Sequence, residues 1–354
     1  MIVWIWLITL RGRAKLSSFH QKAICQVNTL VAQYPFHLYP VVCKAFELAY
    51  LQEELALVTC SSVVEVAIGE GTLSARTFPS DSRVVGLDLS PYSLKHASAL
   101  PHVKRAIVCD CLAPPIRAGS FEVLVANNFL HHVTDKEQTL QNWSRLAGTV
   151  FFNENTRYWC TGWMIPYLAA KLGCNRVATH EADRIEATSI QCLWARSQLD
   201  VTVCKHYDVQ KTVSYMSERT FFLCSIFSFF LRCYGPPTPP VMKSMFLGPL
   251  RFIALPATQK LACLLIRFDQ FQKREADVFI SYSCRSRNFN RATGSNYLVC
   301  PRCKSELTHE NRCNECKNQY VDKDGMLFLL PEELRHIEVD YDSTIARIVP
   351  REHL

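Results

Sequence analysis

Between about residues 62 and 155, short apolar runs alternate with stretches of helical pattern, and this alternation restricts the fold more than any other feature. The apolar runs that read as strands are SVVEVAI (62–68), RVVGLDL (83–89), AIVCD (106–110), FEVLVANNF (121–129) and TVFFNEN (149–155). Strands that alternate with helices pair in parallel and are covered on both faces. The sequence therefore predicts an α/β fold with a doubly wound sheet of the Rossmann type.

Later segments extend the expected sheet to seven strands. DVTVCKHYDV (200–209) is predicted to be the sixth strand, after a helix in ATSIQCLWARSQL, and ADVFISYSC (276–284) the seventh. Between them, a hydrophobic insertion at about 211–275 is rich in Phe and Leu and is expected to form helices.

These patterns divide the chain into five parts. The expected boundaries are 1–60 for an N-terminal helical segment, 61–284 for the α/β domain, 285–296 for a polar linker, 297–331 for a cysteine-rich module and 332–354 for a tail.

The first predicted strand ends in a glycine-containing turn that could hold a nucleoside. Asp88 ends the second strand 17 residues after Gly71, where a carboxylate can accept from ribose hydroxyls, and Asp110 ends the third. A dinucleotide site would have a glycine three residues after Gly71, and none stands there. A cofactor without phosphates, S-adenosylmethionine, fits this turn better. A turn that merely links strand to helix is the alternative.

At these residues the chain resembles the class I S-adenosylmethionine-dependent methyltransferases, in the small-molecule, methyltransferase type 11-like branch. The segments that carry the resemblance are VVEVAIGEG, RVVGLDLSPYSLKHA, VCDCLAPPIRAGSFEVLVANNFLHHV and TLQNWSRLAG. The chain departs from the family pattern at Ala67, which replaces the usual first glycine, at Glu70, and at Gly148, which remains from a Pro-Gly-Gly.

The resemblance implies a role for each residue of the cofactor site. It assigns Glu65, Ala67, Gly69 and Gly71 to the amino-acid end of S-adenosylmethionine, Asp88 to the ribose, Leu89, Asp110 and Cys111 to the adenine, and Asn127 to the methionine part. If the acceptor is a hydroxyl or a carbon acid, a base is needed, and His132 is the candidate catalytic residue. The alternative for His132 is a polar residue that shapes the wall of the pocket. We expect His131 to be an ordinary surface histidine.

Four of the 17 cysteines form two C-x-x-C pairs, Cys300 with Cys303 and Cys313 with Cys316. Such pairs present four thiolates to one tetrahedral Zn²⁺, and a module of this size needs the metal for its stability. Two disulfides are the alternative. The segment from Tyr297 to Pro331 resembles the Trm112-like zinc ribbons that activate methyltransferases as partner subunits. Whether the ribbon here stabilises the enzyme or binds substrate is left open.

The N-terminal apolar run, Ile2 to Leu10, has no basic residue before it and is too short to cross a bilayer. We interpret it as a segment packed on the main domain, with an interfacial anchor as the alternative. The expected location is therefore cytoplasmic, with peripheral membrane contact left open.

The sequence specifies the methyl acceptor less well than the cofactor. The hydrophobic insertion favours a lid over a small-molecule, lipid-linked or glycan-type acceptor. RNA or protein methylation, with the ribbon as a substrate arm, is the runner-up, and a non-catalytic binding module is the third reading. Nucleic acid is disfavoured because seven Lys or Arg stand with three Glu between 285 and 317. Zinc-bound thiolates reduce that excess further, to about +2.

Overall fold

The computed structural model describes residues 17–33, 38–55, 62–156, 194–224, 247–271, 277–292 and 296–331. The N-terminal apolar run, residues 225–246 of the hydrophobic insertion, and the tail lie outside these ranges, so the predictions made for them stay predictions.

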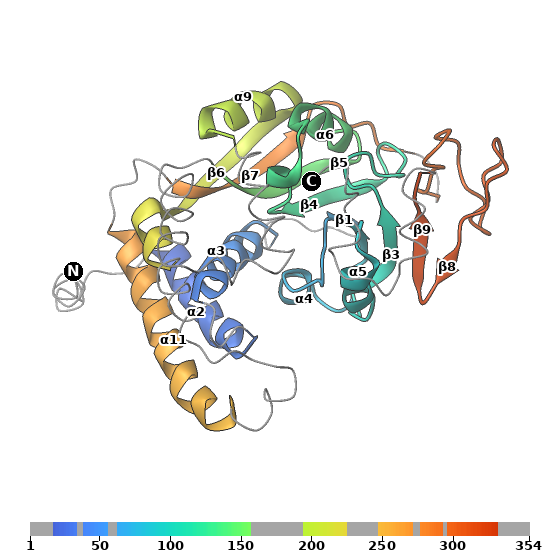
Figure 1. Ribbon diagram of the computed structural model, residues 1–354. Coiled ribbons are helices and arrows are strands. Elements are labelled where there is room, and N and C mark those ends of the chain that lie inside the picture. The colour runs from blue at the N-terminus through green and yellow to red at the C-terminus, as the bar shows by residue number, and fades with distance from the viewer. Residues whose placement is uncertain are drawn as a thin grey trace, which may run out of the picture. The chain divides into compact units, whose positions relative to one another are not determined.

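A nine-stranded sheet forms the framework, in the order β6-β7-β5-β4-β1-β2-β3-β9-β8 (Figure 1). Its strands are β1 (Val63–Val66), β2 (Val84–Asp88), β3 (Val103–Cys109), β4 (Phe121–Asn127), β5 (Ala147–Asn155), β6 (Tyr207–Ser217), β7 (Asp277–Ser286), β8 (Asp322–Lys323) and β9 (Met326–Leu329). The α/β prediction is confirmed. The two strands beyond the expected seven come from the cysteine-rich module.

The centre of the sheet is parallel because the chain crosses over between strands. β1 pairs in parallel with both β2 and β4, with Val63 opposite Val84 on one side and Val123 on the other. All four residues of β1 are buried, as expected for a strand covered on both faces. The crossovers contain α4 (Ser74–Thr77), α5 (Pro91–Ser98) and α6 (Lys136–Trp143).

Local capping fixes where two of these helices begin. Ser90 accepts a hydrogen bond from the Ser93 N–H at the start of α5, and Asp135 accepts one from the Gln138 N–H at the start of α6. At the other end of α6, the fully buried Trp143 donates its indole N–H to the backbone oxygen of Cys111, 2.9 Å away. This bond fixes α6 against the segment that follows β3.

The prediction of a strand at 200–209 is wrong. Residues 196–206 form the helix α9 (Arg196–His206), and β6 starts at Tyr207. The pair Val201 and Val203 imitates the alternation of a strand, but Leu199, Thr202 and Val203 are the buried residues, at helical spacing. Since β6 continues to Ser217, any helical insertion begins after that residue.

The described chain divides into two compact units. One contains the helices α2 (Ser18–Gln33), α3 (Leu38–Leu55) and α11 (Leu247–Gln270), which pack on one another, with adjoining ends of β6 and β7. Aromatic rings build its core: Phe46 lies 5.5 Å from Tyr215, which stacks on Phe279 at 5.5 Å. None of the helices in the described part is long and apolar enough to span a membrane.

The other unit contains β1 to β5, α9 and the cysteine-rich module. There β9 pairs in parallel with β3, with Ala106 opposite Met326 and Cys109 opposite Leu329, and Figure 1 shows the two strands side by side. Every residue of β9 is buried. The module is therefore part of the sheet rather than a tethered appendage.

Candidate functional site

The carboxyl ends of β1 and β4 meet where the strand order reverses. The chain builds β1, β2 and β3 outward in one direction and then places β4 on the other side of β1. In open parallel sheets, ligands bind outside the carboxyl ends of the strands at such a reversal. The turn after β1 and the loop after β4 are therefore the candidate site.

The turn after β1 is held by Asp88, the last residue of β2. The Gly69 N–H donates to Asp88 Oδ2 at 2.7 Å, and the Ser90 N–H donates to Oδ1 at 2.8 Å. Burial raises the pKa of Asp88, and the backbone donors oppose that rise. Each carboxylate oxygen has two lone pairs, so Asp88 can still accept from a hydroxyl.

Three residues of the turn have left-handed backbone conformations: Ala67 (φ 55°), Gly69 (φ 56°) and Gly71 (φ 72°). A Cβ on Gly71 would lie 2.5 Å from Leu100 Cδ1 and 3.3 Å from Ala97, so this glycine lets the turn pack on the end of α5. A Cβ on Gly69 would meet nothing within 4 Å. Gly69 therefore borders open space in which a ligand could lie against the backbone.

Buried polar atoms without partners lie on β1 and at the end of β4, the two strands that meet at this turn. Glu65 is 4% exposed, and burial raises its pKa to about 7 although Ser74 donates a hydrogen bond to it. Its Oε2 and both amide atoms of Asn127 have no hydrogen-bond partner among the described residues. Such orphaned atoms at a ligand-binding edge fit a polar ligand such as S-adenosylmethionine.

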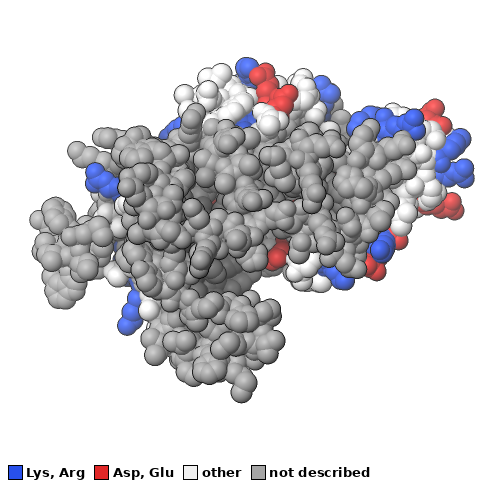
Figure 2. All heavy atoms as spheres, viewed as in Figure 1, with Lys and Arg blue, Asp and Glu red and all other residues white. Residues whose placement is uncertain are grey.

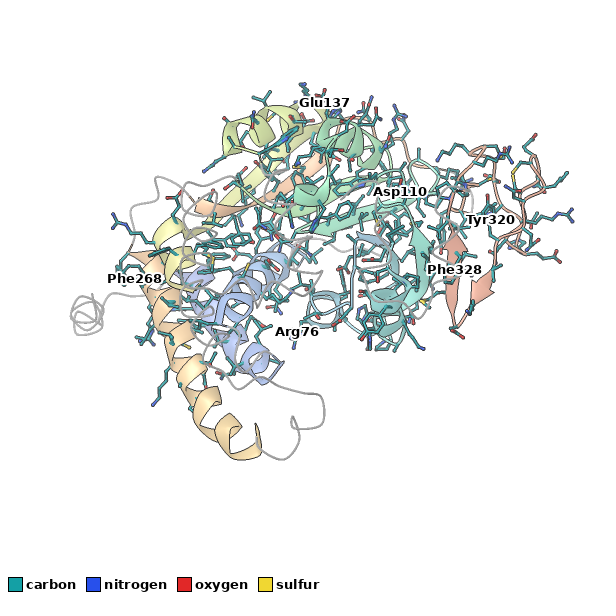
Figure 3. All side chains as sticks on the ribbon, viewed as in Figure 1. Arg76, Asp110, Glu137, Phe268, Tyr320 and Phe328 are labelled. Carbon is teal, nitrogen blue, oxygen red and sulfur yellow. The ribbon has the colours of Figure 1, made fainter. Side chains whose placement is uncertain are left out.

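The residues expected at the adenine lie at the same edge. Cys111 is buried, and its hydrogen bond to Cys109, with burial, raises the pKa of its thiol. The Ala67 N–H reaches this thiol, which places the end of β3 next to the turn after β1. Asp110, labelled in Figure 3, accepts from the Leu112 N–H at 2.9 Å, and Leu89 is half-buried.

The loop after β4 forms a single helical turn, η1 (Leu130–His132). His132, the expected catalytic residue, is exposed, and no contact of the described residues tests that role. The expectation for His131 is wrong: its side chain is 12% exposed, and its Nδ1 lies 2.7 Å from Oε1 of the buried Glu154 on β5. Sequence reasoning missed Glu154. The sequence did contain a signal for it, because a glutamate inside an apolar strand and near the carboxyl end of that strand is unusual.

The four predicted zinc ligands come together in the ribbon. The sulfur atoms of Cys300, Cys303, Cys313 and Cys316 all lie within 4.8 Å of one another. Cys300 and Cys316 have sulfurs 3.5 Å apart, Cys303 and Cys313 have sulfurs 3.3 Å apart, and none of the four forms a disulfide. Tetrahedral Zn²⁺ with bonds of about 2.3 Å needs sulfurs about 3.8 Å apart. The cluster therefore fits zinc.

The backbone around the cluster repeats the same knuckle twice. The residues after each C-x-x-C, Lys304 and Lys317, are left-handed, with φ of 63° and 60°. The Arg302 and Cys303 N–H groups point at the first sulfur of one pair, and those of Glu315 and Cys316 at the first sulfur of the other. Such N–H donors stabilise thiolates. With four sulfurs as ligands, the site is closed and structural rather than catalytic.

Comparison with known proteins now identifies part of the chain. A family model described as "Methyltransferase domain" matches residues 64–149, which cover β1 to the start of β5. Residues 64–149 therefore match a methyltransferase domain. No curated protein sequence matches the chain.

Solved structures of methyltransferases are similar to the chain in fold. Phosphoethanolamine N-methyltransferase 2 of Haemonchus contortus, solved with S-adenosyl-L-methionine, is 14% identical with a TM-score of 0.42, over 68% of this chain and 52% of that one. This methyltransferase domain and its neighbouring segments thus span about half of that enzyme. Geranyl diphosphate C-methyltransferase of Streptomyces coelicolor is 15% identical with a TM-score of 0.40, over 68% of this chain and 75% of that one.

The left-handed Ala67 leads to a first prediction. A Cβ in this conformation costs about 1–2 kcal/mol, so Ala67→Gly should raise the free energy of unfolding, by about 1 kcal/mol after the added chain entropy of glycine. Urea denaturation measures the change. The matched control is Ala75→Gly on the exposed face of α4, which should lower stability by about 0.5–1 kcal/mol. A loss of stability in Ala67→Gly would contradict the argument.

The second prediction concerns the metal. The purified protein should contain one zinc per chain, and Cys300→Ser should release it, because a serine hydroxyl is a poor zinc ligand. Since β9 belongs to the sheet, metal loss should also lower the thermal midpoint of the whole methyltransferase domain. Elemental analysis and calorimetry measure both effects. Cys25→Ser, an exposed cysteine on α2, is the control and should change neither. Full zinc content in Cys300→Ser would refute the assignment.

Proposed function

We propose that the protein transfers a methyl group from S-adenosylmethionine to a small-molecule, lipid-linked or glycan-type acceptor. The observation that carries this proposal is the set of orphaned polar atoms around the open space at Gly69, inside a methyltransferase domain. When bound, S-adenosylmethionine supplies an electrophilic methyl group on a sulfonium. The protein's task is then to orient the acceptor, exclude water and accept a proton.

The cofactor residues divide by the chemistry they offer. Glu65 carries a buried carboxylate that suits a cationic amino group, and Asn127 offers both a donor and an acceptor. Asp88, already fixed by two backbone N–H groups, suits paired hydroxyls. Ala67, Gly69 and Gly71 let the backbone turn beneath the ligand, while Leu89, Asp110 and Cys111 border its base.

The contacts between the ribbon and the methyltransferase domain support a role for the ribbon as a built-in, Trm112-like stabiliser of that domain. Besides the pairing of β9 with β3, the Val299 N–H donates to the Pro115 backbone oxygen at 3.0 Å. Arg117 forms an ion pair with Glu306 at 2.5 Å. Tyr320 and Phe328, labelled in Figure 3, are buried within the ribbon and at the sheet edge. These contacts hold the module against the domain.

The charges of the linker and ribbon favour a small acceptor over RNA. Arg287 pairs with Asp208 at 2.7 Å, and Arg291 pairs with Glu122 at 3.3 Å. Phe289, the aromatic between them, packs near Gly148 rather than forming an open stacking surface. Figure 2 shows acidic side chains interspersed with basic ones over the ribbon. A site for nucleic acid would need a continuous basic stripe.

The state of the cysteines supports a reducing compartment. Every cysteine in the described ranges is free, including the buried Cys43, Cys224 and Cys284. We therefore propose a cytoplasmic location, with peripheral membrane contact as the alternative that the hydrophobic insertion keeps open.

The third prediction tests the cofactor. Asp88→Asn should weaken S-adenosylmethionine binding at least about 10-fold, because an amide nitrogen cannot accept a hydrogen bond from a backbone N–H or from a hydroxyl. Titration calorimetry measures the affinity, and thermal denaturation checks that the variant folds. Asp81→Asn, at an exposed carboxylate before β2, is the matched control and should bind normally. If the wild-type protein bound no S-adenosylmethionine, the proposed function would be refuted.

The fourth prediction concerns pH. Because burial raises the pKa of Glu65 to about 7, this carboxyl must lose its proton to face a cationic ligand. Affinity for S-adenosylmethionine should therefore increase up to about 10-fold per pH unit below pH 7 and level off above it. Calorimetry from pH 5.5 to 7.5 measures the slope. Glu65→Gln should abolish it, whereas Glu70→Gln, at an exposed residue, should retain it. If the affinity of Glu65→Gln depended on pH as steeply as that of the wild type, a group other than Glu65 would be responsible for the pH dependence.

A further inference from the structure

A buried carboxylate organises the loop after β4. Glu154 is 2% exposed and lies one residue before the end of β5. Its Oε2 accepts from the Leu130 N–H at 2.6 Å, and its Oε1 accepts from the Asn155 N–H at 2.8 Å and contacts His131 Nδ1 at 2.7 Å. One side chain thus ties the loop of one strand to the end of its neighbour.

This arrangement assigns the proton on His131. Glu154 Oε1 already accepts one N–H, so the contact at 2.7 Å is a hydrogen bond in which Nδ1 donates. In the neutral ring, Nε2 then keeps its lone pair and can accept a proton. Once it has done so, the imidazolium remains beside a buried carboxylate, which stabilises the charge.

His132 is in a different electrostatic position. Its ring centroid lies 4.0 Å from that of His131. Neighbouring side chains remove part of the hydration of the His132 ring, and this is the main cause that lowers its pKa to about 4, although Glu154 opposes the shift. A base of that strength is a poor proton acceptor near neutral pH.

We propose that His131 is the proton acceptor of the methyl-transfer reaction and that Glu154 is the positioning residue that fixes its tautomer. This inference rests on the proposed function. In the step, the acceptor's O–H bond breaks and its proton passes to Nε2 of His131. The acceptor oxygen forms the bond to the methyl carbon, and the electrons of the broken carbon–sulfur bond remain on the sulfur.

The proposal restricts the acceptor class. A thioether or a tertiary amine carries no proton to lose and needs no base. A dedicated histidine–carboxylate pair therefore favours an acceptor that loses a proton, of which a hydroxyl is the simplest. The titratable side chains in contact with His131 are Glu154 from β5 and His132 from its own loop, and only Glu154 is acidic.

The first experiment needs no acceptor. Nitrogen-15 NMR of histidine-labelled, full-length protein reports which ring nitrogen carries the proton. We expect neutral His131 to be protonated at Nδ1 in the wild type. Glu154→Gln should reduce that tautomer, because the carboxylate that accepts from Nδ1 is lost. His131 protonated mainly at Nε2 in the wild type would overturn the proposal.

The second experiment measures transfer of labelled methyl from S-adenosylmethionine into an organic extract of cells that lack the protein. His131→Asn should reduce the initial rate about 100-fold or more, and His132→Asn much less. Glu154→Gln should also lower the rate. His309→Asn, at an exposed histidine of the ribbon, is the matched control and should be unchanged. A larger loss in His132→Asn than in His131→Asn would overturn the proposal.

The two experiments separate this inference from the proposed function. If the wild type neither binds S-adenosylmethionine nor transfers label, the proposed function fails and the role of His131 fails with it, whatever its tautomer. If the wild type is active and His131→Asn retains full rate, only the role of His131 fails.

Discussion

The parallel pairing of β1 with both β2 and β4 is the constraint on which the rest of the site depends. This pairing places Asp88 and the loop after β4 on either side of the turn that follows β1. Without it, the N–H of Gly69 would have no carboxylate to hold it, and the orphaned atoms of Glu65 and Asn127 would not share one edge. The local chemistry of the turn is thus a consequence of strand order.

Local patterns in the sequence were enough to predict the central sheet and the metal cluster. The first five strands are apolar runs flanked by turns, and a C-x-x-C pair defines its own geometry over four residues. The strand expected at 200–209 failed because Val201 and Val203 match the alternation of a strand, whereas the buried residues Leu199, Thr202 and Val203 have helical spacing.

The remaining features depend on partners distant in the chain. The pairing of β9 with β3 joins residues near 326 to residues near 106, and no local period encodes it. Glu154 likewise reads as one residue of an apolar strand until the fold brings His131 to it from the preceding loop. The conformation of Ala67 was only partly predictable from the sequence. Its position in the glycine pattern indicated a turn, but only the structure shows its left-handed φ and the associated strain.

The position of the ribbon in the sheet bears on whether it stabilises the enzyme or binds substrate. β9 is next to β3, three strand spacings from β1 and four from β4, or about 14 and 19 Å. Leu329 is in register with Cys109, immediately before Asp110 and Cys111. The ribbon can therefore steady the segment expected at the adenine, whereas the histidine loop and Glu154 lie on the far side of β1. That separation favours a stabilising role, because a substrate arm would have to reach across the cofactor edge to present its acceptor.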